Sequence, residues 1–306
     1  MKRDLISLTD LSSDEILQLL DVALDLKSKK GQLHDALKGK SVGLIFQKPS
    51  NRTRVSFEVG IHQLGGNCVY LGPKEINLGK RETPSDVANT LSRYLDAIVA
   101  RTFLNSDVID LANHATIPII NGLSDLYHPC QALADLLSVK ENFQDLKGMT
   151  LTYVGDGNNV CHSLMLGCAK VGMHMHIASP KGYAPKEKVL SQAKEFAQSS
   201  GATIKLFTSP REAIHNTHVV YTDVWVSMGQ EEESQERIDL FKEFQINNDL
   251  TALADKDYIF MHCLPAHRGQ EVTAEVIDGP HSIIFDQAEN RMHIQKAILM
   301  FLLGSH

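Results

Sequence analysis

The sequence is poor in several features that mark specialised classes of protein. Its 306 residues include five cysteines, an odd number with no Cys-x-x-Cys pair, so neither a disulfide framework nor a thiolate zinc site is indicated. No stretch approaches the run of about 18 apolar residues that a membrane-spanning helix needs. Basic residues are fewer than acidic ones, and the net charge of −7 disfavours a surface that follows a nucleic-acid backbone. We therefore expect no nucleic-acid partner and no membrane association.

The remaining composition is that of an ordinary globular chain. Hydrophobic residues make up 43% and charged residues 22%, and the length predicts about two domains. The first residues, Met-Lys-Arg-Asp-Leu, contain no apolar core or cleavage site of a signal peptide. Together with the absence of a disulfide pattern, this predicts a cytoplasmic protein.

Short runs of β-forming residues alternate with helical patterns along the whole chain. A capping box at residues 12–15 predicts an opening helix, and residues 41–46 predict a strand that leads through a loop at 48–50 into a helix ended by Gly65-Gly66. The other predicted strands are 69–71, 97–100, 117–120, 150–154, 174–178, 204–207, 218–222 and 258–263. The alternation predicts an α/β fold of two domains, each a mainly parallel sheet flanked by helices, with right-handed crossovers.

The polar stretch 139–147 predicts the domain boundary, so residues 1–140 would form the first domain and residues 141–285 the second. The last helix, about 286–306, carries an apolar stripe and is expected to pack back on the first domain. Ligands of open α/β sheets bind beyond the carboxyl ends of the strands. We therefore expect the active site in the cleft between the domains.

The first candidate binding segment is residues 48–54, Lys-Pro-Ser-Asn-Arg-Thr-Arg, between a predicted strand and a predicted helix. A helix N-terminus presents free N–H groups and a partial positive charge. Here two hydroxyls and two guanidinium groups are added, a combination that suits a phosphate. The Gly-x-x-x-x-Gly-Lys pattern of a Walker A loop is absent. The alternative is a capped helix with solvated arginines.

Further candidates in this part of the site are polar residues near strand ends and at the last helix. His128 and Gln131 follow the predicted strand 117–120, and both can donate to a carbonyl oxygen. Arg101 follows an earlier predicted strand, and Arg291 lies near the start of the last helix. The alternatives are a proline-started helix with an incidental histidine, and arginines that form only surface ion pairs.

Two loops of the second half could hold a small ligand. Residues 155–159, Gly-Asp-Gly-Asn-Asn, look like a dinucleotide loop, but Val160 stands where the third glycine is needed and no acidic residue ends the next strand. The asparagines, Asn159 among them, could pair with a ligand's carboxylate or carbonyl, or form only a tight turn. Asp223 and Ser227, in a segment with the one tryptophan, could hold both ends of an amino-acid zwitterion, or belong to an ordinary loop.

Cys263 ends a predicted strand in a His-Cys-Leu-Pro segment, where a neighbouring positive charge could activate its thiol. Inert packing is the alternative. Further ligands at suitable spacing are missing, so we expect no metal at the histidine pairs His174/His176 and His262/His267.

Taken together, these segments resemble the aspartate/ornithine carbamoyltransferase family. Residues 50–54 are similar to the family's carbamoyl phosphate loop, and residues 128–131 to its second signature. Residues 223–229 and 262–265 are similar to the elements that mark the ornithine branch. The segments occur in the family's order, and the resemblance extends from the opening helix to the last one.

The resemblance implies transfer of the carbamoyl group from carbamoyl phosphate to the side-chain amine of L-ornithine, giving L-citrulline and phosphate in arginine biosynthesis. No metal and no redox cofactor is implied. The implied catalytic residues are Arg101, His128, Cys263 and Arg291. The implied carbamoyl phosphate ligands are Ser50, Asn51, Arg52, Thr53, Arg101, His128, Gln131, Cys263, Leu264 and Arg291. The implied ornithine ligands are Asn159, Asp223, Ser227 and Met228.

The resemblance also implies a homotrimer or a multiple of trimers, and two positions depart from the family's pattern. Asn51 stands where a threonine is expected, a change that keeps the backbone donor and should tune affinity. Residues 77–82 are similar to the loop that reaches a neighbouring subunit's site, with Asn77 where glutamine or histidine is expected.

Other functions stay open on the sequence alone. A sister carbamoyltransferase could act on putrescine, which lacks the α-carboxylate that residues 227–229 would hold, or on an N-acylated ornithine, which lacks the charged α-amine that Asp223 would hold. Aspartate would need additional cations on the acceptor side. A non-catalytic phosphate- or amino-acid-binding protein should have lost reactive-centre residues, yet Arg52 and His128 are present. The hypothesis of a nucleotide-binding oxidoreductase rests on the glycines of residues 155–157 alone.

Overall fold

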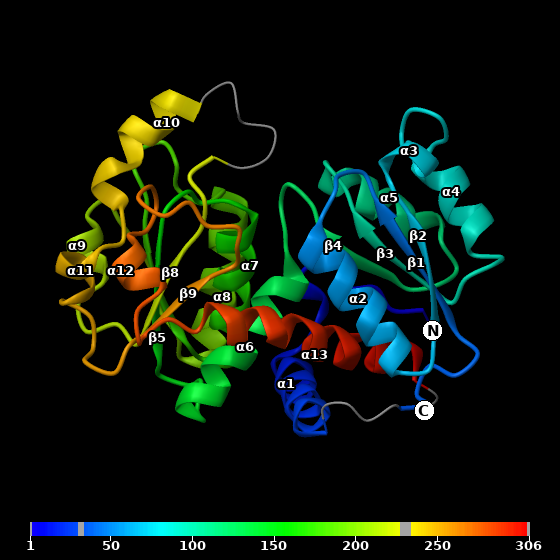
Figure 1. Cartoon of the computed structure of the whole chain (residues 1–306), viewed down its shortest axis with the longest axis horizontal. Coiled ribbons are helices and arrows are strands. Elements are labelled where there is room, and N and C mark those ends of the chain that lie inside the picture. The colour runs from blue at the N-terminus through cyan, green and yellow to red at the C-terminus, as the bar shows by residue number, and fades with distance from the viewer. Residues whose placement is uncertain (1, 30–33, 227–233, 305–306) are drawn as a thin grey trace. The chain divides into compact units, whose positions relative to one another are not determined.

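The computed structural model describes residues 2–29, 34–226 and 234–304 and divides into two compact units (Figure 1). Unit 1 consists of Met1–Leu137 and Glu289–His306, and unit 2 of Ser138–Ala288. The predicted ligands Ser227 and Met228 lie outside the described residues.

Unit 1 is built on a four-stranded parallel sheet of strand order β2–β1–β3–β4. Its strands are β1 (Ser41–Phe46), β2 (Asn67–Leu71), β3 (Ala97–Arg101) and β4 (Ile119–Leu123). The central strand β3 reads Ala-Ile-Val-Ala-Arg and is buried along its whole length, as expected for a strand covered on both faces. β4 begins two residues later than predicted because Pro118, which has no N–H, cannot donate to a ladder.

The helices of unit 1 include an opening helix that begins at the capping box predicted from the sequence. Ser12 accepts a hydrogen bond from the N–H of Glu15, and the Glu15 carboxylate accepts one from the N–H of Ser12, which closes the capping box. The helices are η1 (Leu8–Asp10), α1 (Ser13–Ser28), α2 (Asn51–Gln63), α3 (Pro73–Ile76), α4 (Pro84–Leu91) and α5 (Asn105–His114). Two helices run through the division of the chain, α6 (Pro129–Phe143) and the last helix α13 (Ile284–Leu303), drawn in red in Figure 1.

Unit 2 holds a five-stranded parallel sheet of strand order β7–β6–β5–β8–β9. Its strands are β5 (Thr150–Val154), β6 (His174–Ala178), β7 (Ile204–Phe207), β8 (Val219–Thr222) and β9 (Ile259–His262). Its helices are α7 (Asn159–Val171), α8 (Glu187–Ser200), α9 (Pro210–Ala213), α10 (Ser234–Phe241), η3 (Lys242–Phe244), α11 (Asn248–Thr251) and α12 (Ala274–Ile277). The predicted α/β fold with two mainly parallel sheets is therefore confirmed.

The registers of the two sheets align the loops that carry the candidate residues. In unit 1, Phe46 pairs with Arg101, so the loop after β1 and the end of β3 meet at one edge. In unit 2, Thr222 pairs with both Val154 and His262, so the loops after β5, β8 and β9 leave the sheet side by side. Within the described residues, no helix has the length and hydropathy that crossing a membrane requires.

Candidate functional site

The candidate anion-binding segment of unit 1 is the start of α2. Ser50 is extended (φ −158°) and caps the helix, with its hydroxyl accepting from the N–H of Thr53 at 3.4 Å. The helix then begins at Asn51, so the N–H groups of its first turn have no partner within the helix. A helix start of this kind attracts negative charge.

Two buried guanidinium groups converge on the hydroxyl of Thr53. Arg291 Nη2 donates to Thr53 Oγ1 at 2.7 Å, and Arg101 Nη1 donates to the same oxygen at 3.5 Å. Arg101 is 5% exposed and Arg291 3% exposed. The alternative that these arginines form only surface ion pairs is therefore wrong. Residues from β3, α2 and α13 build this part of the site, although up to 238 positions separate them.

His128 and Gln131 belong to the same buried group. Burial, followed by the positive charges of Arg291, Arg101, Lys48 and Arg52, lowers the pKa of His128 well below its usual value. The imidazole is thus neutral near pH 7 and can donate one N–H without titrating. Gln131, in the first turn of α6, accepts from Arg291 Nη1 at 3.0 Å and donates to Asp135 at 2.8 Å.

Lys48 adds a fourth cation, whose charge depends on pH. Burial, and next the repulsion of Arg101, lower its pKa to about 8, an effect that Asp125 partly offsets. The ammonium nitrogen lies 5.3 Å from the centre of the Phe103 ring. Four cationic side chains and a helix N-terminus thus act on one region, which suits a small dianion such as a phosphoryl group.

On unit 2, the candidate residues centre on the carboxylate of Asp223, which is 7% exposed and directly follows β8. Asp223 Oδ2 accepts from Asn158 Nδ2 at 2.8 Å. Asp223 Oδ1 accepts from the N–H of Val224 at 2.8 Å and from the thiol of Cys263 at 3.0 Å. The segments after β5, β8 and β9 therefore meet at a single carboxylate.

The residue that makes this bond to Asp223 is Asn158, the neighbour of the predicted ligand Asn159. Asn158 also caps α7, because its side-chain oxygen accepts from the N–H groups of Val160 and Cys161. Asn159 is the first residue of α7 and is half-buried. The asparagine pair thus combines the predicted turn role with a role at the acidic centre.

The segment after β9 is held by a buried histidine. His262 Nδ1 accepts from the N–H of Leu264 at 2.9 Å, and His262 Nε2 lies 3.1 Å from the Glu271 carboxylate. Glu271 is fully buried and also accepts from the N–H of His267. Leu264 adopts a positive φ of 59° and precedes a cis peptide bond to Pro265. These contacts give Cys263 and Leu264 a defined backbone position.

The side chains of Asp223, His262 and Cys263 bring three metal-binding atom types within 4.8 Å of one another. Both ring nitrogens of His262 already have hydrogen-bond partners, and the Cys263 thiol donates a hydrogen bond to Asp223. A metal ligand would have to give up these bonds and be deprotonated. The donor set therefore does not fit a metal site.

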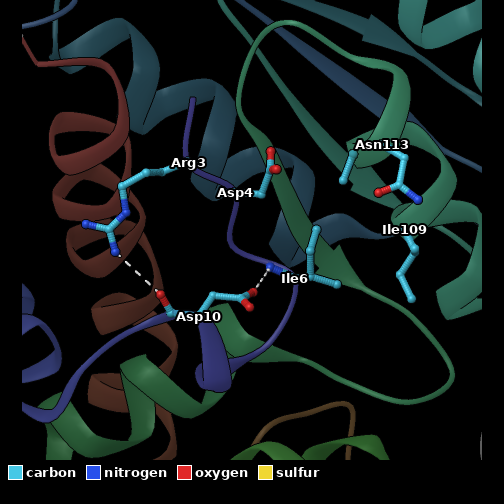
Figure 2. Close-up of a pocket in the computed structure, with 7 residues that line it drawn as sticks. Arg3, Asp4, Ile6, Asp10, Ile109 and Asn113 are labelled. Carbon is cyan, nitrogen blue, oxygen red and sulfur yellow. Dashed lines mark hydrogen bonds between the residues drawn. The ribbon is translucent and has the colours of Figure 1, made fainter. Parts of the chain in front are cut away.

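A hollow of about 380 Å³ in unit 1 carries no comparable chemistry (Figure 2). It is lined by Arg3, Asp4, Ile6, Asp10, Ile109, Ala112 and Asn113. Arg3 pairs with Glu15, and Asp10 accepts from the N–H groups of Ile6 and Ser7. Its charged groups thus tie down the N-terminal segment.

Two buried charged residues near the site are not identified from the sequence. Glu271 and Arg237 are buried within unit 2, yet neither ends a predicted strand. The available signal for Arg237 is weak: it stands four residues before Phe241 on a short helix, after the acidic run 231–233. Charged residues are mostly exposed, so their burial is not readable from such a pattern.

Comparison with known proteins gives matches along almost the whole chain. A model described as "Aspartate/ornithine carbamoyltransferase, carbamoyl-P binding domain" matches residues 3–141, and one described as "Aspartate/ornithine carbamoyltransferase, Asp/Orn binding domain" matches residues 147–302.

Relatives and solved structures agree with these models. The chain is 54% identical to the ornithine carbamoyltransferase of Anoxybacillus flavithermus over 98% of this chain and 96% of that protein. It is 51% identical to the anabolic ornithine carbamoyltransferase of Pyrococcus furiosus over 99% and 96% of the two chains. A structure of the Pyrococcus furiosus enzyme superposes with a TM-score of 0.97, covering 100% of this chain and 98% of that one at 51% identity. The Gloeobacter violaceus enzyme gives a TM-score of 0.90 at 45% identity, covering 99% of each chain.

Proposed function

The chain belongs to the aspartate/ornithine carbamoyltransferase family, and from this we infer the reaction it catalyses. It is a transferase that moves the carbamoyl group of carbamoyl phosphate to the side-chain amine of L-ornithine, giving L-citrulline and phosphate in arginine metabolism. The observation that carries this conclusion is identity of 51% and 54% over nearly the full length to proteins named for this activity.

We propose that unit 1 binds carbamoyl phosphate and unit 2 binds ornithine, an assignment that the two family descriptions support. In unit 1, the start of α2 would hold the phosphoryl group through Ser50, Asn51, Arg52 and Thr53. The guanidinium groups that converge on the Thr53 hydroxyl support this assignment, because phosphate oxygens can replace or extend those bonds.

The carbonyl oxygen of the substrate would lie against Arg101, His128 and Thr53, with Gln131 beside them. Attack by an amine places negative charge on this oxygen, and each donor already in place typically contributes about 3 to 4 kcal/mol to the transition state. His128 suits this role because its neutral ring presents an N–H donor over the working pH range. As the C–O bond breaks, charge moves onto the phosphate, where Arg52 and Arg291 would stabilise it.

On the acceptor side, Asn159, Asp223, Ser227 and Met228 would hold the α-amino and α-carboxylate groups of ornithine. Cys263 and Leu264 would line the reacting centre. The attacking amine must be neutral, since an ammonium has no lone pair to form the new C–N bond. The hydrogen-bonded pair of Cys263 and Asp223 would orient this amine.

We also propose that the protein works in the cytoplasm as a homotrimer or a multiple of trimers. The support for the assembly is the resemblance of residues 77–82 to a loop that reaches a neighbouring subunit. That segment is a turn closed by the bond from the N–H of Gly79 to the carbonyl of Glu82. Light scattering on the purified protein checks this proposal, since it should give three times the mass of one chain or a multiple of that value.

Citrulline formation by the purified protein tests the reaction. Carbamoyl phosphate is supplied with L-ornithine, and putrescine, N-acetylornithine and L-aspartate are run in parallel. Activity with ornithine alone is expected. Activity with another acceptor would overturn the assignment of Asp223 and the residues that follow it, and no product with any acceptor would favour a binding protein.

A further inference from the structure

One buried arginine of unit 2, Arg237, is not among the proposed substrate ligands. Arg237 lies on α10 and is 4% exposed. Its Nε donates to the carbonyl oxygen of Trp225 at 2.8 Å, and its Nη2 forms an ion pair with Asp156. The guanidinium also lies over the ring of Tyr183, 4.7 Å from its centre, and 5.6 Å from the centre of Phe241.

The partners of Arg237 come from three neighbouring loops of the sheet. Asp156 follows β5, Tyr183 lies between β6 and α8, and Trp225 follows β8. These strands are adjacent in the order β6–β5–β8, so their carboxyl ends form one continuous edge. The N–H of Gly157 also donates to the carbonyl of Tyr183 at 2.8 Å, which ties two of the loops directly. Arg237 thus joins the loops that leave this edge.

Two short paths lead from Arg237 to Asp223. Along the first, Asp156 stands two residues before Asn158, whose amide donates to Asp223 Oδ2. Along the second, Trp225 stands two residues after Asp223. Asp223 is therefore held between two segments that are both fastened to one guanidinium group.

The positive charge of Arg237 affects the electrostatics around Asp223, in addition to the hydrogen bonds that the guanidinium makes. Asp156 is a second acidic group close enough to Asp223 for the two charges to interact unfavourably. Arg237 compensates the charge of Asp156 through their ion pair. The carboxylate of Asp223 then remains as the one that can meet a positively charged group of a ligand.

We propose that Arg237 is a positioning residue for the amino-acid acceptor, which fixes Asp223 through Asp156 and Trp225 and cancels the charge of Asp156. This inference rests on the proposed function, because it deepens the assignment of Asp223 as a ligand of the α-amino group.

Lysine could not replace arginine here. The planar guanidinium donates in two directions at once, to a carbonyl and to a carboxylate, while its face rests on an aromatic ring. An ammonium group is a single point of charge on a flexible stem and can serve only one of these partners well.

The test compares Arg237→Lys, Arg237→Gln and the double variant Arg237→Gln with Asp156→Asn in the full-length protein. Arg268→Gln is the matched control, because Arg268 also pairs with an aspartate, Asp278, but both side chains are about half exposed. The measurements are KM for each substrate, kcat, the inhibition constant of L-2-aminopentanoate and the melting temperature. L-2-aminopentanoate keeps the α-amino and α-carboxylate groups of ornithine but lacks the side-chain amine, so it reports binding without chemistry.

For both single variants, we expect KM for ornithine and the inhibition constant to rise about 10- to 100-fold, the usual effect of slightly misplaced binding groups. KM for carbamoyl phosphate should stay within about twofold, since most of its proposed ligands belong to unit 1, whereas Arg237 and its partners belong to unit 2. The double variant should recover part of the ornithine affinity, because it removes the uncompensated carboxylate. Arg268→Gln should behave as the wild type.

Wild-type ornithine KM in a folded Arg237→Gln protein would overturn the proposal. So would an equal rise in KM for both substrates, or a loss of folding in every Arg237 variant including the lysine and double variants, since a purely structural role gives these results. If the wild type forms no citrulline, the proposed function fails instead. Ornithine binding is then followed by the fluorescence of Trp225, the one tryptophan of the chain, and unchanged binding in Arg237→Lys would reject the positioning role as well.

Discussion

The thiol of Cys263 donates a hydrogen bond to the carboxylate of Asp223 across 3.0 Å, although 40 positions separate them in the sequence. The two residues follow the adjacent strands β9 and β8, so the sheet itself brings them together. The same carboxylate is bound on its other oxygen by Asn158. One acidic group therefore meets the thiol and an amide from two further loops.

Replacing Cys263 by alanine should lower kcat for citrulline formation more than it changes KM for carbamoyl phosphate, because nine other residues are proposed to bind that substrate. The thiol contacts Asp223 in unit 2, whereas Thr53, Arg101 and Arg291 hold the proposed anion site of unit 1. Steady-state kinetics with carbamoyl phosphate varied at saturating ornithine checks this expectation. Cys68→Ala is the control, since Cys68 lies on the edge strand β2. Wild-type values of kcat and KM in Cys263→Ala, as expected for the control, would remove Cys263 from the mechanism.

The hydroxyl of Thr53 accepts from two buried arginines, so its loss should be more damaging than its size suggests. Thr53→Val leaves both guanidinium groups without that acceptor and removes one proposed donor to the reacting oxygen. We expect kcat to fall about 10²- to 10³-fold, the usual cost of one such donor. Thr53→Ser keeps the hydroxyl and should retain most activity. A serine variant as impaired as the valine variant would show that the methyl group, and not the hydroxyl, matters.

Residues at the ends of strands could be predicted from the sequence because strand position and loop chemistry are local features. The run Ala-Ile-Val-Ala at 97–100 predicts a buried strand, and in a parallel sheet the residue that follows such a strand lies at the ligand edge. The structure places Arg101 there, as the last residue of β3. Arg237 shows the limit of such reasoning. Its burial depends on Asp156, 81 positions away, and on the ring of Tyr183, and no local pattern records either contact.

Gly157 shows the same limit within a segment that the sequence does single out. The spacing of the glycines in residues 155–159 bears only on the presence of a dinucleotide loop. In the structure, Gly157 follows β5, and a Cβ on it would collide with the backbone of Ala184 and Pro185 in the loop before α8. The close approach of this loop therefore requires a glycine at position 157. The physical reason is a close approach between two segments that are 27 and 28 positions apart, which a single sequence does not reveal.

Gly157→Ala should therefore displace the loop that carries Asn158 and weaken the bond to Asp223. Overpacking of this kind typically costs about 1 to 3 kcal/mol of stability. We expect a lower melting temperature and a higher KM for ornithine, while KM for carbamoyl phosphate serves as the internal control because unit 1 is unchanged. Wild-type values for melting temperature and ornithine KM would contradict the close approach.

Lys48 should make the binding of carbamoyl phosphate depend on pH. Its pKa in the folded protein is lowered from 10.5 to about 8, chiefly by burial and next by the charge of Arg101, with Asp125 acting in the opposite direction. As pH rises through about 8, the ammonium loses its proton and the anion site loses one positive charge. His128 does not add to this change, because its pKa lies well below its ordinary value and the ring is already neutral. The KM for carbamoyl phosphate should therefore be constant near pH 7 and rise above pH 8.

The variants Lys48→Arg and Lys48→Gln separate the effect of the Lys48 charge from other effects of pH. Lys48→Arg keeps a charge that does not titrate in this range, so its KM for carbamoyl phosphate should stay flat through pH 9. Lys48→Gln lacks the charge at every pH, so its KM should be raised at pH 7 and equally flat. Competitive inhibition by inorganic phosphate provides a second measurement, free of any change in the ornithine amine. Phosphate itself titrates near pH 7, so the inhibition constants of wild type and Lys48→Arg are compared at each pH. A parallel pH dependence of the two constants from pH 7 to pH 9 would mean that the titration of Lys48 does not affect the anion site and would assign the change to another group.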